Sequence, residues 1–422
     1  MPRKLRPALA ALAVTLAVPA QAQLAPGLPA GVDRTLQAPT QVLDGVRRAA
    51  DPLLQPVEER ALRPLLDRAG ESRRLLRRHP RLLDVDPAGE LVLKQRLLAI
   101  SPTPEALARV REAGFAEAGR ERMEELGLEV VVLQAPASLD TRAALALLRR
   151  IDPAGSYEFD HVYLRGGTAA SPAAPAAMAA VRNPRDFRIG LIDSGVDANH
   201  PSLADSEVRS WGCNGRPVPD GHGTAVASLL VGGADAQARG GTLYAADIWC
   251  GQPVGGASSA LAGALAWMAR EQVPVVNISL VGPDNALLRR ATQALNQRGQ
   301  VLVAAVGNDG PSAPPLFPAA YPGVIGVTAV DRRQRVLPEA GRGAQVDFAT
   351  LGRLRAAKAH GGWTPVRGTS FAAPLVARAA ALRLPALRAA GADAVVHVLA
   401  QEARDAGPPG RDDIFGLGIL EN

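Results

Sequence analysis

An aspartate, a histidine and a serine stand in three short polar sequences that lie beside apolar stretches of the chain. Asp193 occurs in Asp-Ser-Gly, His222 in Gly-His-Gly-Thr and Ser370 in Gly-Thr-Ser-Phe-Ala-Ala-Pro. A serine hydroxyl is a poor nucleophile until a neighbouring base removes its proton, and a carboxylate can hold that base in the right tautomer. These residue types together predict nucleophilic chemistry at Ser370, with His222 as the base and Asp193 as its partner.

Asn308 supplies a fourth polar group, at the end of the sequence Ala-Ala-Val-Gly-Asn. Its side-chain amide can donate, together with the backbone N–H of Ser370, to the negative oxygen that forms during acyl transfer. Each short sequence alone is weak evidence, because Asp-Ser-Gly is usually a turn and Gly-Thr-Ser is a common helix start. Their joint occurrence in the order Asp, His, Ser is far more specific.

The elements that must position these residues are apolar strands and alanine-rich helices over residues 185–422. Strands are predicted at 187–193, 242–249, 273–280, 300–308 and 323–330, and helices at 257–271, 284–298 and 370–382. The strands are continuous apolar runs, which is typical of strands buried on both faces of a parallel sheet. Catalytic groups of such sheets lie past the carboxyl ends of strands, as Asp193 does. The sequence predicts an α/β fold with a mostly parallel, doubly wound sheet.

Three further segments precede this catalytic domain. Residues 23–88 are rich in arginine and carry leucines at helical spacing, which predicts a basic helical segment. Residues 89–165 are predicted to form a small α/β domain, with strands at 91–100, 128–133 and 157–164. Residues 166–184 are rich in alanine and proline without periodicity, which predicts an exposed linker where proteolysis concentrates.

The N-terminus predicts export. Residues 1–22 combine a basic start, a short apolar core and the small-x-small sequence Ala20-Gln21-Ala22, which is typical of a secretory signal peptide. Export leads to an oxidising compartment, where Cys213 and Cys250 are predicted to form one disulfide; two buried free thiols are the alternative. The sequence leaves open whether the destination is the periplasm or the medium.

Composition bounds the class of protein. The chain has 422 residues, of which 47% are hydrophobic and 21% charged, and a formal net charge of +6. These values exclude a collagen-like, coiled-coil or wholly disordered protein. The aromatic content of 4% disfavours wide base-stacking surfaces, and the basic excess indicates a solvated surface rather than nucleic-acid binding. Beyond the N-terminus no apolar run reaches about 18 residues, so no membrane span is expected in the mature protein.

The polar sequences and their apolar flanks resemble the subtilisin-like serine proteases, or subtilases. The matching stretches span nearly all of 187–422 and read IGLIDSGVDANHP, DGHGTAVAS, VVNISLVGP, VAAVGNDG, YPGVIGVTAVD, RGTSFAAP and FGLGILEN. The resemblance implies a serine endopeptidase with the triad Asp193, His222 and Ser370, and an oxyanion hole formed by Asn308 and the Ser370 N–H. It also implies that a protein or peptide substrate binds as an added strand. The substrate-binding residues would be Ser279, Leu280, Val281, Gly255, Gly256 and Gly307.

Other features follow from the same resemblance. The 89–165 domain is similar to the propeptide of the family, which assists folding and blocks the active site until it is cut off, so it is an expected partner of the catalytic domain. A cis bond is implied between Phe317 and Pro318. Val281 stands where the family usually has glycine, which predicts a narrow first specificity pocket for small or slender side chains. The usual calcium loop is reduced to residues 232–241, so no metal site, strong calcium requirement or other cofactor is expected.

Two functions are compatible with these features. The first is an exported serine endopeptidase that hydrolyses peptide bonds through an acyl-enzyme and processes itself at the linker. The second is a non-catalytic or latent subtilisin-fold protein that binds peptides. The intact Asp, His, Ser and Asn favour the first, and the absence of a His-Glu-x-x-His sequence disfavours a metalloenzyme. The physiological substrate, the oligomeric state and the removal of residues 23–165 stay open.

Overall fold

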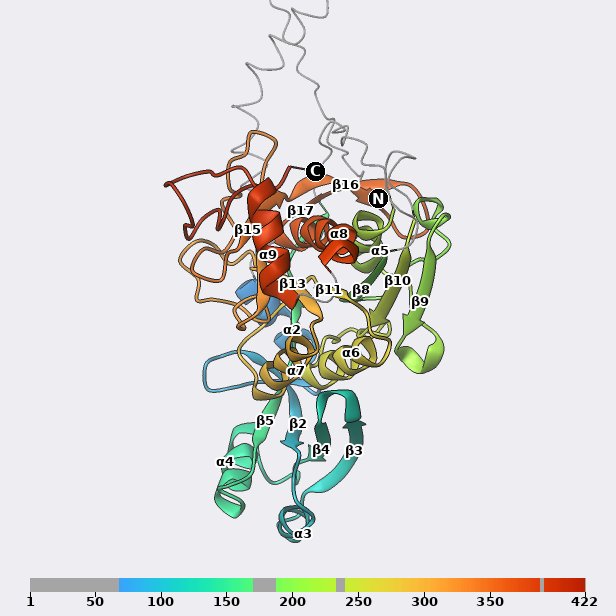
Figure 1. Ribbon diagram of the computed structural model, residues 1–422. Helices are drawn as coiled ribbons and strands as arrows, with labels where there is room; N and C mark the ends of the chain where they lie inside the picture. The colour runs from blue at the N-terminus through green and yellow to red at the C-terminus, as the bar shows by residue number, and fades with distance from the viewer. Residues whose placement is uncertain (1–67, 170–186, 233–239, 388–390, 422) are drawn as a thin grey trace, which may run out of the picture. The chain divides into compact units, whose positions relative to one another are not determined.

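A parallel seven-stranded sheet forms the centre of the C-terminal region in the computed structural model, which describes residues 68–169, 187–232, 240–387 and 391–421 (Figure 1). The strand order is β15, β14, β13, β11, β8, β10, β9, and each adjacent pair is parallel. The order extends from β8 in both directions, so the predicted doubly wound α/β class is confirmed. The strands are β8 Arg188–Asp193, β9 Glu207–Trp211, β10 Thr242–Asp247, β11 Val275–Ile278, β13 Val301–Ala305, β14 Val324–Val330 and β15 Phe348–Leu351.

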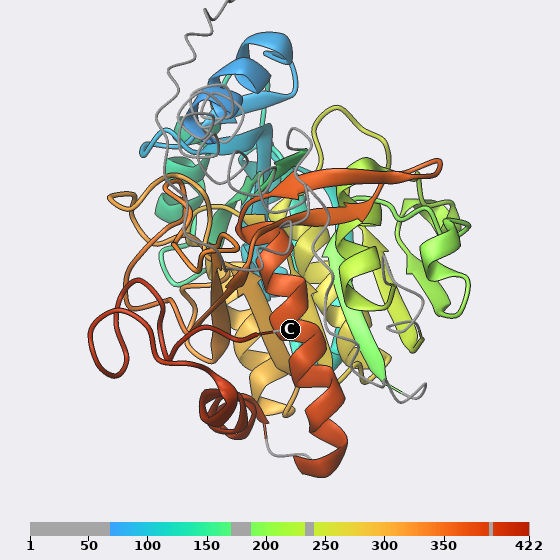
Figure 2. The ribbon, with the colours of Figure 1, turned by 90° about the horizontal axis from the view of Figure 1, so that it is seen from above.

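Helices cover both faces of this large sheet. Leu191 of β8 belongs to a hydrophobic cluster with residues of α5, α8 and α9, whereas its neighbour Ile192 belongs to another cluster with residues of α6 and α7. Successive side chains of a strand point to opposite faces, which is why the inner strands of the sheet are mainly apolar on both faces. Figure 2 shows α8 passing through this region, with β16 and β17 crossing near one of its ends. The helices are α5 Gly221–Leu230, α6 Ser258–Arg270, α7 Ala286–Gln297, α8 Thr369–Leu387 and α9 Gly391–Glu402.

A five-stranded antiparallel sheet precedes the large sheet along the chain. On β2, Leu97 and Ala99 belong to a hydrophobic cluster with residues of α3 and α4, whereas Leu98 and Ile100 belong to the cluster that contains residues of α6 and α7. The small sheet therefore lies between its own helices and those of the large sheet, as Figure 1 also shows. Its strands are β1 Leu83–Val85, β2 Leu91–Ile100, β3 Ala116–Met123, β4 Leu128–Gln134 and β5 Tyr157–His161, and the helices around it are α2 Arg68–Arg78, α3 Pro104–Glu112 and α4 Thr141–Ile151.

The predictions for this region were right in part. The strands predicted at 91–100 and 128–133 are β2 and β4, and the strand predicted at 157–164 is divided into β5 and the short β6, Leu164–Arg165. The helical prediction for residues 23–88 is right at α2 and wrong at β1, and residues 23–67 lie outside the described part of the chain.

Five further strands form two small antiparallel sheets in the described part of the chain. β6 pairs antiparallel with β12 Leu280–Val281, and β7 Thr168–Ala169 pairs antiparallel with β17 Trp363–Arg367, whose other partner is β16 Arg353–Ala357. Gly166, between β6 and β7, is buried. The prediction of an exposed linker at 166–184 is therefore wrong at its first residues, and residues 170–184 are outside the described part.

Two further expectations concern the chain as a whole. The peptide bond between Phe317 and Pro318 is cis, as expected. Among the described helices, none has the length and apolar character needed to cross a bilayer. The predicted signal peptide and most of the shortened loop at 232–241 fall on residues that the structure does not describe.

Candidate active site

Asp193 and His222 meet at the carboxyl end of the large sheet. Asp193 is the last residue of β8 and is fully buried, and His222 lies in the first turn of α5. His222 Nδ1 lies 2.8 Å from Oδ1 and 3.0 Å from Oδ2 of Asp193. Because an ionised carboxylate only accepts, Nδ1 carries the proton and Nε2 is the basic nitrogen. Nε2 is buried and has no hydrogen-bond partner among the described residues, so it is available to accept a proton.

Ser370 and Asn308 lie next to this pair. Ser370 is the second residue of α8, and the ring of the following Phe371 is 5.2 Å from the ring of His222. The Ser370 hydroxyl donates to the backbone oxygen of Ser279 at 2.8 Å. Asn308 Oδ1 accepts the backbone N–H of the residue before Ser370 at 3.1 Å, and its buried Nδ2 has no partner within the described chain. Rotation about one side-chain bond can redirect the hydroxyl, and the Asn308 amide is free to donate.

Residues 162–169, here called the inserted segment, run through this site as an added strand. The backbone N–H of Tyr163 donates to the carbonyl of Gly256 at 2.8 Å. β6 then pairs with β12, with Leu164 opposite Val281, and β7 pairs with β17 further along. The inserted segment is thus held by backbone pairing on both sides of its centre, which is the way an extended peptide adds a strand to a sheet edge.

Gly166, at the centre of the inserted segment, places its carbonyl beside Ser370. Its N–H lies 3.4 Å from the oxygen of Ser279, and its oxygen lies 3.4 Å from the backbone nitrogen of Ser370. A β-carbon built on Gly166 would lie 3.5 Å from the free Nδ2 of Asn308. The carbonyl is thus within hydrogen-bond distance of one proposed oxyanion donor, the Ser370 N–H, and the free amide of Asn308 lies beside the same residue. The arrangement can support attack by the Ser370 hydroxyl on this carbonyl.

Of the six residues expected to bind substrate, four contact the inserted segment and two do not. Ser279 and Gly256 accept its N–H groups, and Leu280 and Val281 form the strand paired with it. Gly255 and Gly307 face side chains: a β-carbon on Gly255 would lie 2.3 Å from the ring of Trp249, and one on Gly307 would lie 2.6 Å from Leu316 Cδ1.

Two polar residues beside Asp193 and His222 were missed from the sequence. The Ser194 hydroxyl lies 3.0 Å from a carboxylate oxygen of Asp193 and 3.0 Å from one of Asp220. Asp220 caps α5 by accepting the N–H of His222 at 2.8 Å, and its other oxygen lies 3.0 Å from the guanidinium of Arg165. Burial acts to raise the pKa of Asp220, but the charge of Arg165 and these hydrogen bonds outweigh it and hold the pKa below its ordinary value. Its place directly before Gly-His-Gly-Thr is the cap signal that could have identified it.

Asp160 of β5 connects the small sheet to the start of α6. It is fully buried, and its carboxylate accepts the N–H of Ser259 at 3.0 Å and the hydroxyls of Ser258 and Ser259 at 3.0 and 2.8 Å. Arg96 Nε lies 2.9 Å from the same carboxylate. A helix N-terminus has free N–H groups and a positive dipole end, so it favours a carboxylate there.

His161, the next residue, forms a second polar connection. Its Nδ1 lies 3.0 Å from Nδ2 of Asn285, which can only donate, so Nδ1 accepts and Nε2 carries the proton towards Asp86 at 3.3 Å. Burial acts to raise the pKa of Asp86, but the hydrogen bond with His161 and those from the N–H groups of Glu90 and Ala88 outweigh it and lower the pKa from 3.8. Asn285 is also the cap of α7, so this connection joins the small sheet to a second helix of the large one.

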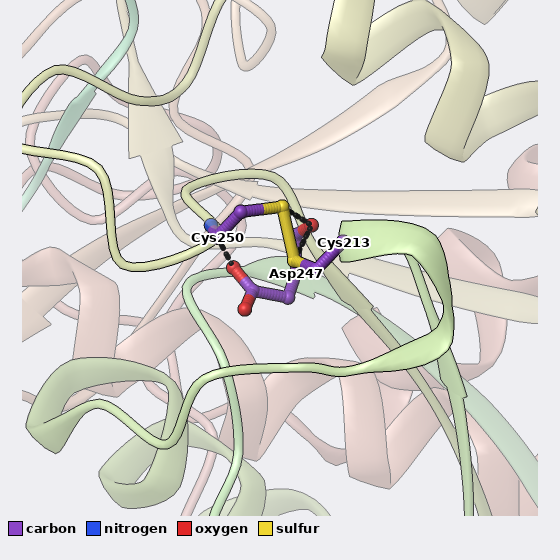
Figure 3. Close-up of side chains that lie close together, drawn as sticks. All are labelled: Cys213, Asp247 and Cys250. Atoms are coloured by element: carbon purple, nitrogen blue, oxygen red, sulfur yellow. Dashed lines mark hydrogen bonds between the residues drawn. A yellow bond between two sulfur atoms is a disulfide. The ribbon is translucent and has the colours of Figure 1, made fainter.

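Cys213 and Cys250 form a disulfide in the structure (Figure 3). Asp247 lies beside it, and its carboxylate accepts the backbone N–H groups of Val218, Trp249 and Cys250, each at 2.9 Å. The two sulfurs and this carboxylate are at ligand distance from one another. However, both sulfurs form the disulfide and the carboxylate oxygens accept these N–H groups, so the cluster has a structural role. It joins the loop before α5 to the loop that leads to Gly256.

Loss of this disulfide should lower stability without removing a reactive group. We expect a Cys213→Ser/Cys250→Ser chain to unfold with a free energy about 2–4 kcal/mol lower, because the cross-link restricts the unfolded chain. Thermal unfolding of both chains with and without reductant measures this. Reductant should shift the wild-type transition towards that of the double variant and leave the variant unchanged. Equal transitions for both chains without reductant would contradict the expectation.

Comparison with known proteins identifies the class of this fold and site. Residues 185–418 match the family model of the subtilase family, which is more than half of the chain. The chain therefore belongs to the subtilase family of serine proteases.

Individual relatives agree with this assignment. Subtilisin DY of Bacillus licheniformis is 31% identical over 247 residues, which cover 56% of this chain and 89% of the relative. Subtilisin E of Bacillus subtilis (strain 168) is 30% identical over 272 residues, which cover 59% of this chain and 70% of the relative. Among solved structures, fervidolysin from Fervidobacterium pennivorans, a keratinolytic enzyme related to subtilisin, has the same fold with a TM-score of 0.68 at 18% identity. That match covers 80% of this chain and 61% of fervidolysin, so it extends beyond residues 185–418.

Proposed function

We propose that this protein is an exported serine endopeptidase that uses Asp193, His222 and Ser370 as its triad and cuts its own chain in the region predicted as the linker. The observation that carries the proposal is the position of the Gly166 carbonyl, whose oxygen lies 3.4 Å from the backbone nitrogen of Ser370 within a strand paired on both sides. Export rests on the signal-peptide pattern of residues 1–22.

In the proposed reaction the Ser370 hydroxyl first rotates from Ser279 to His222 Nε2, which takes its proton as Oγ attacks the scissile carbonyl carbon. The bond to the leaving nitrogen then breaks, and His222 gives the proton to the amine. Water next attacks the acyl-enzyme, gives a proton to His222, and the carboxylic acid departs as Ser370 recovers its proton. Asp193 keeps Nδ1 protonated and stabilises the imidazolium at each transfer.

Asn308 and the Ser370 N–H form the proposed oxyanion hole. Both donors come from fixed elements, because Asn308 is held through Oδ1 and the Ser370 nitrogen belongs to the first turn of α8. Donors that are already oriented stabilise the tetrahedral oxygen without reorganising, which typically contributes about 10²–10³ in rate.

The region at 89–165 acts, in this proposal, as a propeptide-like partner of the catalytic region. Two observations support it. Asp160 caps α6 and Asn285 binds His161, so polar contacts fix the small sheet on two helices. The same region delivers the inserted segment to Ser370, so the catalytic serine is covered for as long as the segment stays.

Intact masses of the purified wild type and of a Ser370→Ala chain test the proposal. We expect a wild type shortened to begin in the 164–186 region and a variant that lacks only its signal peptide. A fluorophosphonate should label the shortened wild type at Ser370 and leave the variant unlabelled. Two chains that both begin near Gln23, with no label on either, would overturn the proposal.

One observation favours the alternative, a latent peptide-binding protein. The Ser370 hydroxyl donates to Ser279 instead of His222, while the inserted segment fills the site. If that arrangement is permanent, the wild type stays intact, does not react with the fluorophosphonate and binds peptides without hydrolysing them. The same mass and labelling experiment therefore separates the two functions.

Acid should weaken the connection between Asp86 and His161. The folded pKa of Asp86 is lowered from 3.8, so its contribution to stability is complete above that value and is lost as pH falls through the folded pKa. In the uncut Ser370→Ala chain we expect the urea midpoint to fall more steeply between about pH 5 and pH 2 than in a chain that also carries Asp86→Asn. Parallel pH profiles for the two chains would contradict this assignment.

A further inference from the structure

We infer that this protease prefers to cut after the sequence aromatic-x-Arg-Gly, where x is any residue. In its own chain this sequence is Tyr163-Leu164-Arg165-Gly166, and the bond cut is the one between Gly166 and Gly167. Asp220 and Trp249 select the arginine. Val281 and Leu316 limit the residue before the bond, and Gly256 and Gly282 leave room for the aromatic residue. The inference rests on the proposed function and adds to it the sequence of the substrate.

The bond is identified by the carbonyl that faces the serine. The Gly166 oxygen is the one within hydrogen-bond distance of the Ser370 nitrogen, at 3.4 Å. On the other side of the bond, a β-carbon on Gly167 would lie 2.6 Å from the ring of Phe371 and 3.0 Å from the carbonyl oxygen of Arg367. A side chain at position 167 would therefore overlap a ring and a backbone oxygen, so glycine is required there for close approach.

Glycine is also favoured before the bond. A β-carbon on Gly166 would lie 2.7 Å from the Ser370 hydroxyl. The space over Gly307, beside Asn308, is filled by Leu316 Cδ1 and Val281 Cγ1, which lie 2.6 and 3.7 Å from the position of a β-carbon there. Both aliphatic side chains are buried. A large side chain before the bond would have to displace them, at the cost of overpacking.

Arginine is favoured at the position before this glycine, because the carboxylate of Asp220 and the ring of Trp249 both contact Arg165. A guanidinium nitrogen of Arg165 lies 3.0 Å from Asp220 Oδ2, and the centre of the guanidinium lies 5.0 Å from the ring centroid of Trp249. Both charged side chains of the pair are about one-third exposed (33% each), so solvent screens their attraction. An ion pair of this kind together with a cation–π contact should amount to about tenfold in rate.

The aromatic requirement comes from Tyr163. Its side chain is completely buried, and its hydroxyl donates to the carbonyl of Pro283. The ring lies against Gly282, where a β-carbon would be 2.7 Å from it, and the Tyr163 carbonyl lies against Gly256, where one would be 2.4 Å away. A tyrosine in this position buries a large apolar ring and satisfies its hydroxyl, so smaller side chains lose both contributions.

Internally quenched peptides test the preference on the processed wild-type enzyme. The reference peptide contains Tyr-Leu-Arg-Gly-Gly-Thr-Ala, and three others replace its tyrosine by alanine, its arginine by alanine, or its first glycine by phenylalanine. We expect kcat/KM to fall about 50-fold, about tenfold and below detection, respectively. N-terminal sequencing of the processed enzyme should begin at Gly167.

Two enzyme variants assign the preference to residues. Asp220→Asn keeps an acceptor for the cap of α5 and removes the charge, so it should reduce the preference for arginine over alanine from about tenfold to about twofold. Asp197→Asn is the matched control, because its carboxylate accepts the N–H groups of Asn199 and His360 and makes none of these contacts. Val281→Ala should allow cleavage after alanine and leucine, and a fluorophosphonate titration corrects each rate for the amount of active enzyme.

The outcomes distinguish failure of the sequence preference, failure of the assigned cleavage bond and failure of the proposed function. A processed enzyme that titrates with fluorophosphonate and cuts denatured casein, but cuts all four peptides within threefold of one another, overturns this preference and leaves the proposed function standing. A mature chain that begins elsewhere than Gly167 overturns the assignment of the bond. A chain that neither titrates nor cuts casein overturns the proposed function, and the preference with it.

Discussion

An Asp193→Asn chain should fold normally and cleave itself and its peptide substrates about 10⁴-fold more slowly than the wild type. Both carboxylate oxygens face His222 Nδ1, at 2.8 and 3.0 Å, and an amide would replace one of them by an N–H donor. The variant also loses the charge that stabilises the imidazolium. The half-time for disappearance of the full-length chain, followed by intact mass, measures the effect on self-cleavage.

Folding of the variant has to be shown in the same experiment. Asparagine keeps one oxygen for the backbone N–H of Ser194, which lies 2.7 Å from Oδ1, so we expect circular dichroism and the melting temperature to stay close to the wild-type values. Asp197→Asn again provides a matched control in the loop after β8 and should retain full activity. Activity of the Asp193 variant within tenfold of the wild type would remove Asp193 from the proposed triad.

Asp160→Ala should cause the largest loss of stability among exchanges outside the proposed triad. The exchange leaves the N–H of Ser259 and the hydroxyls of Ser258 and Ser259 without their acceptor at the buried start of α6. Removing one partner of a buried, charge-assisted set typically costs about 3–5 kcal/mol. Urea unfolding of the uncut Ser370→Ala chain, with and without the Asp160 exchange, gives the difference in the free energy of unfolding.

A second cap in the same region makes a suitable comparison. Asp140 caps α4 by accepting the N–H of Ala143 at 2.8 Å, and it lies on the exposed side of the small sheet. Asp140→Ala should therefore cost only about 1 kcal/mol. Equal losses for Asp140→Ala and Asp160→Ala would show that the contact with α6 adds nothing to an ordinary cap. An intermediate loss is expected for Asp160→Asn, which keeps one acceptor.

The elements that could be predicted are those whose pattern of apolar residues follows directly from how they are buried. The inner strands of the large sheet are buried on both faces, so the centre of β8 and the whole of β13 are continuous apolar runs. β3 was missed because its sequence, Ala-Glu-Ala-Gly-Arg-Glu-Arg-Met, is polar and mostly exposed, with no alternation of apolar residues. The edge strand β9 is polar for the same reason, and two-residue strands such as β7 carry no periodic signal.

The candidate site divides in a similar way. Asp193, His222, Asn308 and Ser370 stand in short sequences that reflect the local backbone of a strand end or helix start, and these can be read without a structure. Asp160 could not be found in this way, because its partner Ser258 is 98 residues away and neither residue is part of a motif. The contact of Arg165 with Asp220 likewise depends on how β6 lies along β12, which only the tertiary structure determines.

The contacts that hold the inserted segment are stronger before Gly166 than after it. Upstream lie a buried tyrosine, the β6–β12 pairing and the carboxylate at the start of α6, whereas downstream lies the two-residue strand β7. After cleavage between Gly166 and Gly167, the fragment that ends at Gly166 would dissociate slowly, whereas the new N-terminus at Gly167 would move out of the site quickly. Enzymatic activity should therefore appear with a lag, and the duration of that lag would be governed by the dissociation of a product and not by the chemical step that forms it.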